Sequence, residues 1–228
     1  KNNSKCEVIY PSILPLKSFP KKKKIISFVG KLNRSKGFNI YGNAIIKILN
    51  KYKNWKSIVV GDEPREKYNF KHKNLKYVGW ISHKKTLELY NLTSISVAPS
   101  FWEEPFGRTS MEAASRGCAT IISKKCGLIE TIPNALYLID LSAKTLFNKI
   151  EYLIKNKKER KKLQKKSYQN VLHKLETNSK KIDAYRNEIL NTINFPIIRK
   201  NNYKIIHISN FGNRLFNRLY FISIAKKI

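Results

Sequence analysis

The sequence predicts an α/β fold in which a parallel β-sheet is flanked by helices, with a helical extension toward the C-terminus. Short apolar runs, several ending at glycine, alternate with segments whose apolar residues recur at helical spacing, and this alternation is typical of βαβ units. From about residue 142 the pattern becomes helical and rich in lysine. The 228 residues, 42% of them hydrophobic, are enough for one or two domains with a core.

The first expected strand covers 25–29, an apolar run that ends at Gly30. A helix is expected over 39–52, where the apolar residues share one helical face. The run 57–60 is again strand-like and stops at Gly61. These three elements form one strand–helix–strand unit, which places two parallel strands in one sheet.

The same alternation continues along the chain. Strand-like runs cover 77–79, 95–98 and 118–122, and helical patterns cover 83–91 and 109–116. A helix between successive strands is what a parallel connection requires. We therefore expect a Rossmann-like parallel sheet flanked by helices.

Composition divides the chain into three parts. Residues 1–24 are expected to be a linker from a preceding domain, because prolines interrupt any helix and Lys21 to Lys24 form a solvated run. Residues 25–195 hold the sheet and its helical extension, which Pro196 ends.

Residues 196–228 are interpreted as a linker and the truncated start of a second Rossmann-like domain. A strand expected over 203–208 precedes a glycine-bearing turn and a helical pattern, which is how such domains begin. The alternative is an added strand and helix on the first sheet. The chain begins at Lys1, lacks a signal-peptide pattern and ends in an apolar stretch, so it is expected to be part of a longer protein.

The formal net charge of +31 comes from 46 Lys and Arg residues against 15 Asp and Glu residues, and 37 of the 46 are lysines. Three explanations stay open: a solvated surface enriched in lysine by A/T-rich codon usage, attraction to an anionic membrane or substrate, and nucleic-acid binding. The lysine-rich stretch 155–166 contains no aromatic residue, which disfavours nucleic acid.

The cysteines and histidines bound the chemistry further. Cys6, Cys118 and Cys126 form no CxxC pair, which disfavours a disulfide scaffold or structural zinc and favours a reducing cytosol. No metal site is predicted, because Asp-x-Asp and His/Cys clusters are absent from the sequence. The four histidines are expected to be structural or solvated. No apolar run approaches the ~18–20 residues that cross a bilayer.

The loop 30–37 reads Gly-Lys-Leu-Asn-Arg-Ser-Lys-Gly and joins the first strand to the first helix. Its three cations and its backbone N–H groups suit a phosphate group. The loop lacks the residue order of a Walker loop. A basic surface loop is the alternative interpretation.

Residues 99–117 carry a second candidate site. Glu104 follows the strand 95–98, Gly107 shapes a tight turn, and Thr109 and Glu112 lie in the first turn of the next helix. A helix N-terminus favours an anion, and the two carboxylates can accept hydrogen bonds from hydroxyl groups. A nucleotide sugar combines these two features, a phosphate and a polyol. Alternatively, Glu112 only complements the helix dipole and Glu104 faces solvent.

Several motifs, taken in order, resemble those of glycosyltransferase family 4. They are Gly-Lys-Leu…Lys-Gly, Val-Gly-Asp, Val-Gly-Trp, Pro-Ser…Glu-Glu-Pro-Phe-Gly…Glu-Ala…Gly-Cys-Ala and Gly-Leu-Ile-Glu. The match covers roughly residues 8–195, the C-terminal donor-binding half of a GT-B enzyme. The resemblance implies a retaining glycosyltransferase that moves a sugar from a nucleotide diphosphate sugar to an acceptor hydroxyl.

The resemblance also implies a catalytic set. Glu104 would lie beside the transferred sugar, and Lys31 and Lys36 would hold the developing charge of the diphosphate. Lys31 stands where the family usually has arginine. Gly30 would let the loop backbone approach the diphosphate.

The implied substrate-binding residues lie on three segments. Glu112 would bind the ribose hydroxyls, and Trp80 would border the base. Backbone amides at Phe106, Gly107 and Arg108, together with Thr109 in the first helical turn, would meet the sugar and phosphate. The resemblance departs from the family at Cys126-Gly127, where Gly-Gly is usual.

The expected partners are a nucleotide-sugar donor, a sugar or lipid-linked acceptor and an anionic membrane surface, with no metal and no cofactor. By family analogy the acceptor is a precursor of bacterial cell-surface polysaccharide or lipopolysaccharide, and the protein is cytoplasmic or peripheral on the inner face of the membrane. The alternatives are a basic nucleic-acid-binding α/β protein and a non-catalytic nucleotide-sugar-binding module. Because the acceptor half is absent, this chain alone is expected to be inactive.

Overall fold

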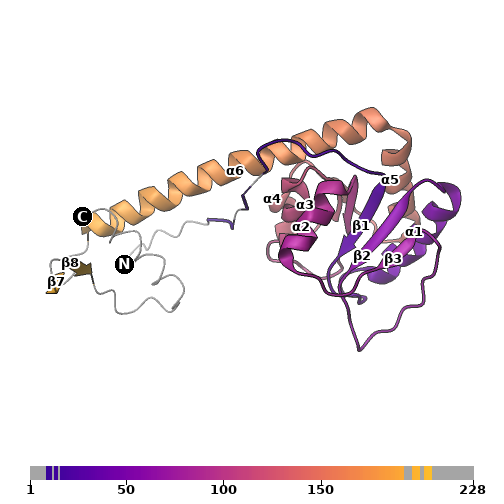
Figure 1. Cartoon of the computed structure of the whole chain (residues 1–228), viewed down its shortest axis with the longest axis horizontal. Coiled ribbons are helices and arrows are strands. Elements are labelled where there is room, and N and C mark those ends of the chain that lie inside the picture. The colour runs from indigo at the N-terminus through magenta and orange to yellow at the C-terminus, as the bar shows by residue number, and fades with distance from the viewer. Residues whose placement is uncertain (1–8, 12, 15, 193–196, 201–202, 207–228) are drawn as a thin grey trace. The chain divides into compact units, whose positions relative to one another are not determined.

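A six-stranded parallel β-sheet is the centre of the fold in the computed structural model, which describes residues 9–11, 13–14, 16–192, 197–200 and 203–206 (Figure 1). Its strands are β1 (Ile25–Val29), β2 (Lys56–Val60), β3 (Leu75–Tyr77), β4 (Ile95–Ala98), β5 (Ala119–Ser123) and β6 (Leu136–Leu138). Their order across the sheet is β3-β2-β1-β4-β5-β6, and every neighbouring pair is parallel. The predicted Rossmann-like sheet is therefore confirmed.

Helices cover both faces of this sheet, and Figure 1 shows it between them. The helices are α1 (Phe38–Lys51), α2 (His83–Leu92), α3 (Arg108–Ser115), α4 (Cys126–Thr131), α5 (Ala143–Lys155) and α6 (Lys157–Thr192). Helices α1 and α5 pack on one face, where Ile26 and Phe28 of β1 are buried in the main hydrophobic core. Helices α3 and α4 pack on the other face against Ile122 of β5. Burial on both faces explains why the central strands are short continuous apolar runs.

The elements expected up to residue 122 are confirmed to within two residues of their bounds. The short helix α4 and strand β6 were not expected. They have six and three residues, too few for a periodic pattern to show, and they lie on both sides of Pro133. Among the helices in the described part of the chain, none combines the length and apolar character that crossing a membrane demands.

Before β1, the residues that the structure describes (9–11, 13–14 and 16–24) have no regular secondary structure, but they contact the sheet and its helices. The Tyr10 ring stacks on Phe106, with 5.6 Å between centroids, and the Tyr168 hydroxyl donates to the Leu16 carbonyl. The expectation that Lys21 to Lys24 are all solvated is wrong for Lys22. Its ammonium donates to the carbonyls of Tyr90 (2.8 Å) and Arg116, which lie at the C-terminal ends of α2 and α3.

The chain divides into two compact units, Lys1–Asn178 and Ser179–Ile228, and α6 contributes to both. In the second unit, β7 (Ile197–Lys200) pairs antiparallel with β8 (Tyr203–Ile206). The strand expected over 203–208 coincides with β8 where it is described, whereas β7 was not expected. Residues 207–228 lie outside the described residues, so the second Rossmann-like domain stays a prediction. The domain boundaries at 24/25 and 195/196 also stay predictions.

Candidate functional site

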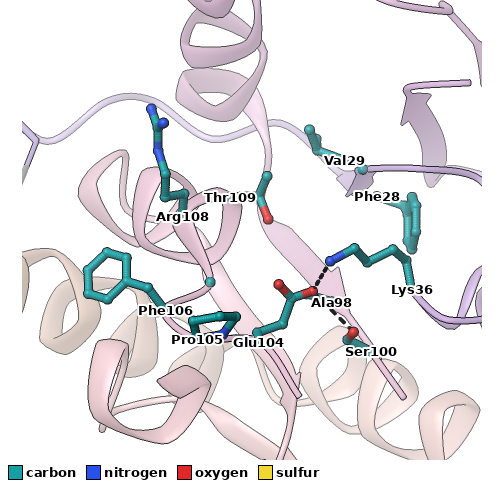
Figure 2. A pocket seen from close by; sticks show the side chains of 12 residues that line it. Phe28, Val29, Lys36, Ala98, Ser100, Glu104, Pro105, Phe106, Arg108 and Thr109 are labelled. Carbon is teal, nitrogen blue, oxygen red and sulfur yellow. Dashed lines mark hydrogen bonds and ion pairs between the residues drawn. The ribbon is translucent and has the colours of Figure 1, made fainter. Parts of the chain in front are cut away.

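A pocket of about 340 Å³ opens where β1 and β4 end, at the carboxyl edge of the sheet (Figure 2). The chain builds β1, β2 and β3 in one direction and then crosses β1 to build β4, so this is the point where the strand order reverses. Ligands of open α/β sheets bind at such points. The pocket is lined by Phe28, Val29, Gly30, Lys36, Ala98, Ser100, Glu104, Pro105, Phe106, Gly107, Arg108 and Thr109.

The loop between β1 and α1 is fixed by close backbone contacts. Gly37 caps α1 with φ 71°, and a Cβ atom there would lie 1.9 Å from the Pro99 carbonyl oxygen, so only glycine fits. The Ser35 carbonyl accepts hydrogen bonds from the amides of Phe101 and Trp102, both at 2.9 Å. The loops after β1 and β4 are therefore joined at the pocket.

A buried carboxylate supports the same loop from the next strand. Asn33 Oδ1 accepts hydrogen bonds from the Lys36 amide (3.0 Å) and the Ser35 hydroxyl (2.9 Å), while Asn33 Nδ2 donates to Glu63 Oε2 at 3.2 Å. Glu63 follows β2, and Arg65 donates to both of its carboxylate oxygens. Hydrogen bonding from Arg65 lowers the pKa of Glu63 to about 2. Glu63 is therefore ionised at neutral pH and holds Asn33 in place.

The functional side chains that meet in the pocket are Lys36 and Glu104. Lys36 Nζ forms an ion pair with Glu104 Oε1, and the Ser100 hydroxyl donates to the same oxygen at 3.1 Å. Figure 2 shows the Lys36 side chain reaching toward Glu104, with the Thr109 hydroxyl facing the same space. The pocket thus offers the Lys36 ammonium, the Glu104 carboxylate and the Thr109 hydroxyl to a ligand.

Helix α3 begins at the pocket. Its N-cap, Gly107, has φ 76° and no side chain, so the first amides of α3 are not capped by a side chain. The turn before it is held by Gly127, whose amide donates to the Glu104 carbonyl at 3.0 Å. A Cβ atom on Gly127 would lie 2.0 Å from the Pro105 carbonyl oxygen. Neighbouring Cys126, where the resemblance to family 4 implies a glycine, has φ 38°, in the left-handed region that favours glycine.

Glu112 lies one turn into α3, beside the pocket. Its side chain is 8% exposed, and Oε1 lies 3.2 Å from His83 Nε2 and 3.7 Å from a guanidinium nitrogen of Arg108. His83 begins α2 and was expected to be only structural or solvated. Its contact with Glu112 depends on the packing of α2 against α3, which no local signal in the sequence indicates.

The structure brings most of the predicted site residues together. Gly30, Lys36, Glu104 and residues 106–109 all line the pocket, and Glu112 adjoins it through Arg108. Lys31 and Trp80 do not line it. Both are exposed, Trp80 to 69%, on the loops that follow β1 and β3, and the roles assigned to them stay predictions.

The arrangement suits an anionic ligand that carries hydroxyl groups. The Lys36 ammonium and the start of α3 favour phosphate, and Glu104 and Glu112 can accept hydrogen bonds from a sugar. Within the residues that the structure describes, no three His, Cys, Asp or Glu side chains gather as they would around a metal ion.

Residues 14–170 match the family described as Glycosyl transferases group 1. An uncharacterised glycosyltransferase of Methanocaldococcus jannaschii is 31% identical over 117 residues, which cover 48% of this chain and 29% of that protein. Spore coat protein SA of Bacillus subtilis is 28% identical over 123 residues, covering 48% of this chain and 33% of its own length. The chain therefore spans about a third of the length of these curated relatives.

The same fold is found in solved structures. The C-terminal domain of a group 1 glycosyltransferase from Francisella tularensis has a TM-score of 0.62 and 25% identity, with coverage of 71% of this chain and 94% of that one. The Anabaena protein HepE, in complex with UDP and glucose, has a TM-score of 0.63 and 17% identity. That alignment covers 73% of this chain and 49% of HepE.

Proposed function

Because this chain belongs to the Glycosyl transferases group 1 family, we propose that it is the donor-binding part of a glycosyltransferase with a nucleoside diphosphate sugar as donor. The observation that carries the proposal is the meeting of Lys36 with Glu104 at the switch point of the sheet, next to the start of α3. The complexes of HepE with UDP, and with UDP and glucose, support this class of donor.

The finer assignments follow from the resemblance to family 4. We propose that Lys36 and the α3 amides bind the diphosphate and stabilise its charge as the sugar bond breaks. Glu104 orients the transferred sugar, and Glu112 accepts hydrogen bonds from the ribose. The leaving phosphate oxygen takes the acceptor proton, so that the sugar is transferred with retention of its anomeric configuration and without a separate base.

The pathway and location belong to the same proposal. A precursor of bacterial cell-surface polysaccharide or lipopolysaccharide is the proposed acceptor, bound mainly by residues outside this chain. Free thiols at Cys118 and Cys126 are consistent with a reducing cytoplasm, and the net charge of +31 favours an anionic inner membrane surface nearby.

Calorimetry tests the proposed donor site. We expect UDP, GDP or ADP to bind in the presence of EDTA, because the ligands of the phosphates are a lysine and backbone amides. Lys36→Ala should weaken diphosphate binding more than nucleoside binding, whereas Glu112→Ala should weaken both. A charge-assisted hydrogen bond contributes about 1.5–3 kcal/mol, or roughly 10–100-fold in affinity.

Lys31→Ala is the matched comparison, since Lys31 is an exposed cation of the same loop. An effect as large as that of Lys36→Ala would show that Lys31 also reaches the phosphate. Binding that needs magnesium or manganese, or no effect of Lys36→Ala and Glu112→Ala, would contradict the proposed site.

A further inference from the structure

A second hollow lies at the opposite, amino-terminal edge of the same sheet. It has a volume of about 540 Å³ and is bordered by the starts of β1, β2 and β3 and by the end of α2. Five lysines line it: Lys23, Lys24, Lys56, Lys73 and Lys76. No aspartate, glutamate or aromatic residue is among its lining residues. The donor pocket lies at the carboxyl ends of the strands, so the two sites are separate.

The hollow exists because part of one sheet face is uncovered. The register pairs Ile58 of β2 with Lys76 of β3, so their side chains lie on the same face of the sheet. Lys56 lies two positions before Ile58 on β2 and therefore points to that face as well. Helix α2 lines this hollow only through its last residue, Leu92. Beside the lysines, the hollow is lined by the apolar residues Ile25, Ile58 and Leu92.

The segments that carry these lysines are tied to one another through their backbones. The Lys56 amide donates to the Lys24 carbonyl at 3.0 Å, and the Ser57 amide donates to the Asn74 carbonyl at 2.8 Å. Asn74 Nδ2 donates to the Lys53 carbonyl, also at 2.8 Å. The positions from which the lysines extend are thus set before any ligand binds, which lowers the entropic cost of binding.

The charge of this hollow is not neutralised by the protein. In the part of the chain that the structure describes, Lys36 and Lys51 form ion pairs with glutamates, but the five lysines of the hollow form none. Burial, with the nearby ammonium groups of Lys53 and Lys73, lowers the pKa of His72 beside them. The local field therefore favours an anion.

We propose that this lysine hollow binds a phosphate-bearing group with two or more negative charges, either a free condensed phosphate or a phosphorylated lipid headgroup. Ammonium groups bind phosphate as point charges from several directions, which five lysines on three segments provide. The volume lies within the range of small-ligand pockets, about 300–1,000 Å³. Single-stranded nucleic acid is disfavoured because no lining residue offers a ring on which a base could stack.

Amide chemical shifts in a titration with inorganic pyrophosphate test the proposal on the whole chain. We expect shifts at Lys56, Asn74 and Lys76 that saturate independently of any shifts in the loop 30–37. The double variant Lys56→Gln/Lys76→Gln should weaken this binding at least about tenfold. Lys161→Gln/Lys165→Gln removes the same charge from exposed positions of α6 and should change the affinity for pyrophosphate less than about twofold.

Co-sedimentation with vesicles of phosphatidylcholine, with and without phosphatidic acid, whose phosphomonoester headgroup ionises twice, distinguishes the two sources. If the chain binds the anionic vesicles and Lys56→Gln/Lys76→Gln abolishes that binding, the ligand is a lipid headgroup. If the chain binds pyrophosphate but not the vesicles, the ligand is a soluble phosphate. Equal losses in both double variants, or no shifts at the three amides, would overturn the proposal. Displacement of pyrophosphate by single-stranded RNA at lower concentration would also overturn it, in favour of a nucleic-acid surface.

Discussion

Glu104 has two opposed effects in the pocket at the ends of β1 and β4, which is the proposed donor pocket. Its carboxylate pairs with Lys36, and its negative charge lies where the proposed diphosphate would enter. We therefore expect Glu104→Gln to tighten UDP binding by about fivefold, or about 1 kcal/mol, because Lys36 loses a competing partner. UDP-sugar binding should gain less, because the carboxylate that receives the sugar hydroxyls is lost. Calorimetry with UDP and UDP-glucose measures both.

The neighbouring Glu103 provides the control for that measurement. Glu103→Gln removes the same charge from an exposed side chain one residue away, so it should leave UDP affinity nearly unchanged. If Glu104→Gln instead weakens UDP binding, Glu104 contacts the nucleotide directly and its assignment to the sugar is wrong.

A second prediction at the residue scale concerns Gly127. A Cβ atom there would meet the Pro105 carbonyl oxygen at 2.0 Å and the Phe106 amide nitrogen at 2.8 Å, and both are backbone atoms that cannot rotate away. Gly127→Ala should therefore lower the free energy of unfolding by about 1–3 kcal/mol and displace the turn before α3. Thermal unfolding measures the first effect and UDP affinity the second.

Cys126→Ala is the comparison for Gly127→Ala. Position 126 already carries a Cβ atom at φ 38°, so this change adds no backbone contact and should alter stability little. Cys126→Gly should stabilise the protein modestly, since glycine adopts this conformation without strain. Similar unfolding temperatures for Gly127→Ala and the native chain would show that the turn is not as closely packed as the structure indicates.

Single residues could be predicted from the sequence where one chain segment determines their position. Lys36 and Glu104 each follow a recognisable strand, and the resemblance to family 4 implied that the two belong to one site. Glu63 and His83 were missed because their partners, Asn33 and Glu112, belong to other elements. Such contacts depend on how β2 packs beside β1 and how α2 packs beside α3. The hydrophobic periodicity of the sequence does not indicate this packing.

At the scale of elements, the loop after β2 holds the loop after β1. Glu63 connects them through Asn33, and Glu66 Oε2 accepts a hydrogen bond from the Arg34 amide at 2.8 Å. Two glutamates thus contact the loop 30–37. The arrangement explains how a loop with three cations can hold a single conformation.

The pKa of Glu63 makes this connection sensitive to pH. Folding lowers it from 4.5 to about 2, so the ionised carboxylate stabilises the folded state above about pH 4.5, and that contribution is lost as pH falls toward 2. Glu63→Gln should lower the unfolding temperature near neutral pH. The difference from the native chain should shrink between about pH 5 and pH 3.

Thermal unfolding of both chains across that pH range checks the expectation. Asp140→Asn is a useful comparison, because hydrogen bonds from Ser142 and Thr145 also lower the pKa of Asp140, which does not line the proposed donor pocket. Both variants should show a converging pH dependence, but only Glu63→Gln should also weaken UDP binding. A constant difference at every pH would mean that folding does not lower the pKa of Glu63.

The elements that the sequence did not predict are the short ones. Strands β1, β4 and β5 are buried on both faces and therefore appear as apolar runs, whereas β6 has only three residues, of which Leu138 alone is buried. Lys22 was expected in solvent because a run of lysines usually is. Instead, two helix ends supply carbonyl oxygens to its ammonium group. Both differences arise from tertiary contacts that override a local pattern.

At the scale of the whole molecule, the donor pocket belongs to one compact unit. Every residue that lines it lies between Phe28 and Thr109, within the unit Lys1–Asn178, while β7 and β8 belong to the unit Ser179–Ile228. Nucleotide binding should therefore depend on the first unit alone. Sugar transfer should require more than this unit, because the chain spans only about a third of the length of its curated relatives and the proposed acceptor site lies outside the chain.

Removal of residues 197–228 tests this division. We expect the shortened chain to bind UDP within about twofold of the full chain, because no lining residue is lost. We expect neither chain to transfer sugar in a radiolabelled-donor assay. Tyr10→Ala is the contrasting variant, since Tyr10 stacks on Phe106 and should support the pocket from its other side. Loss of UDP binding on truncation, or transfer by the full chain but not by the shortened one, would show that residues 197–228 contribute to the active site.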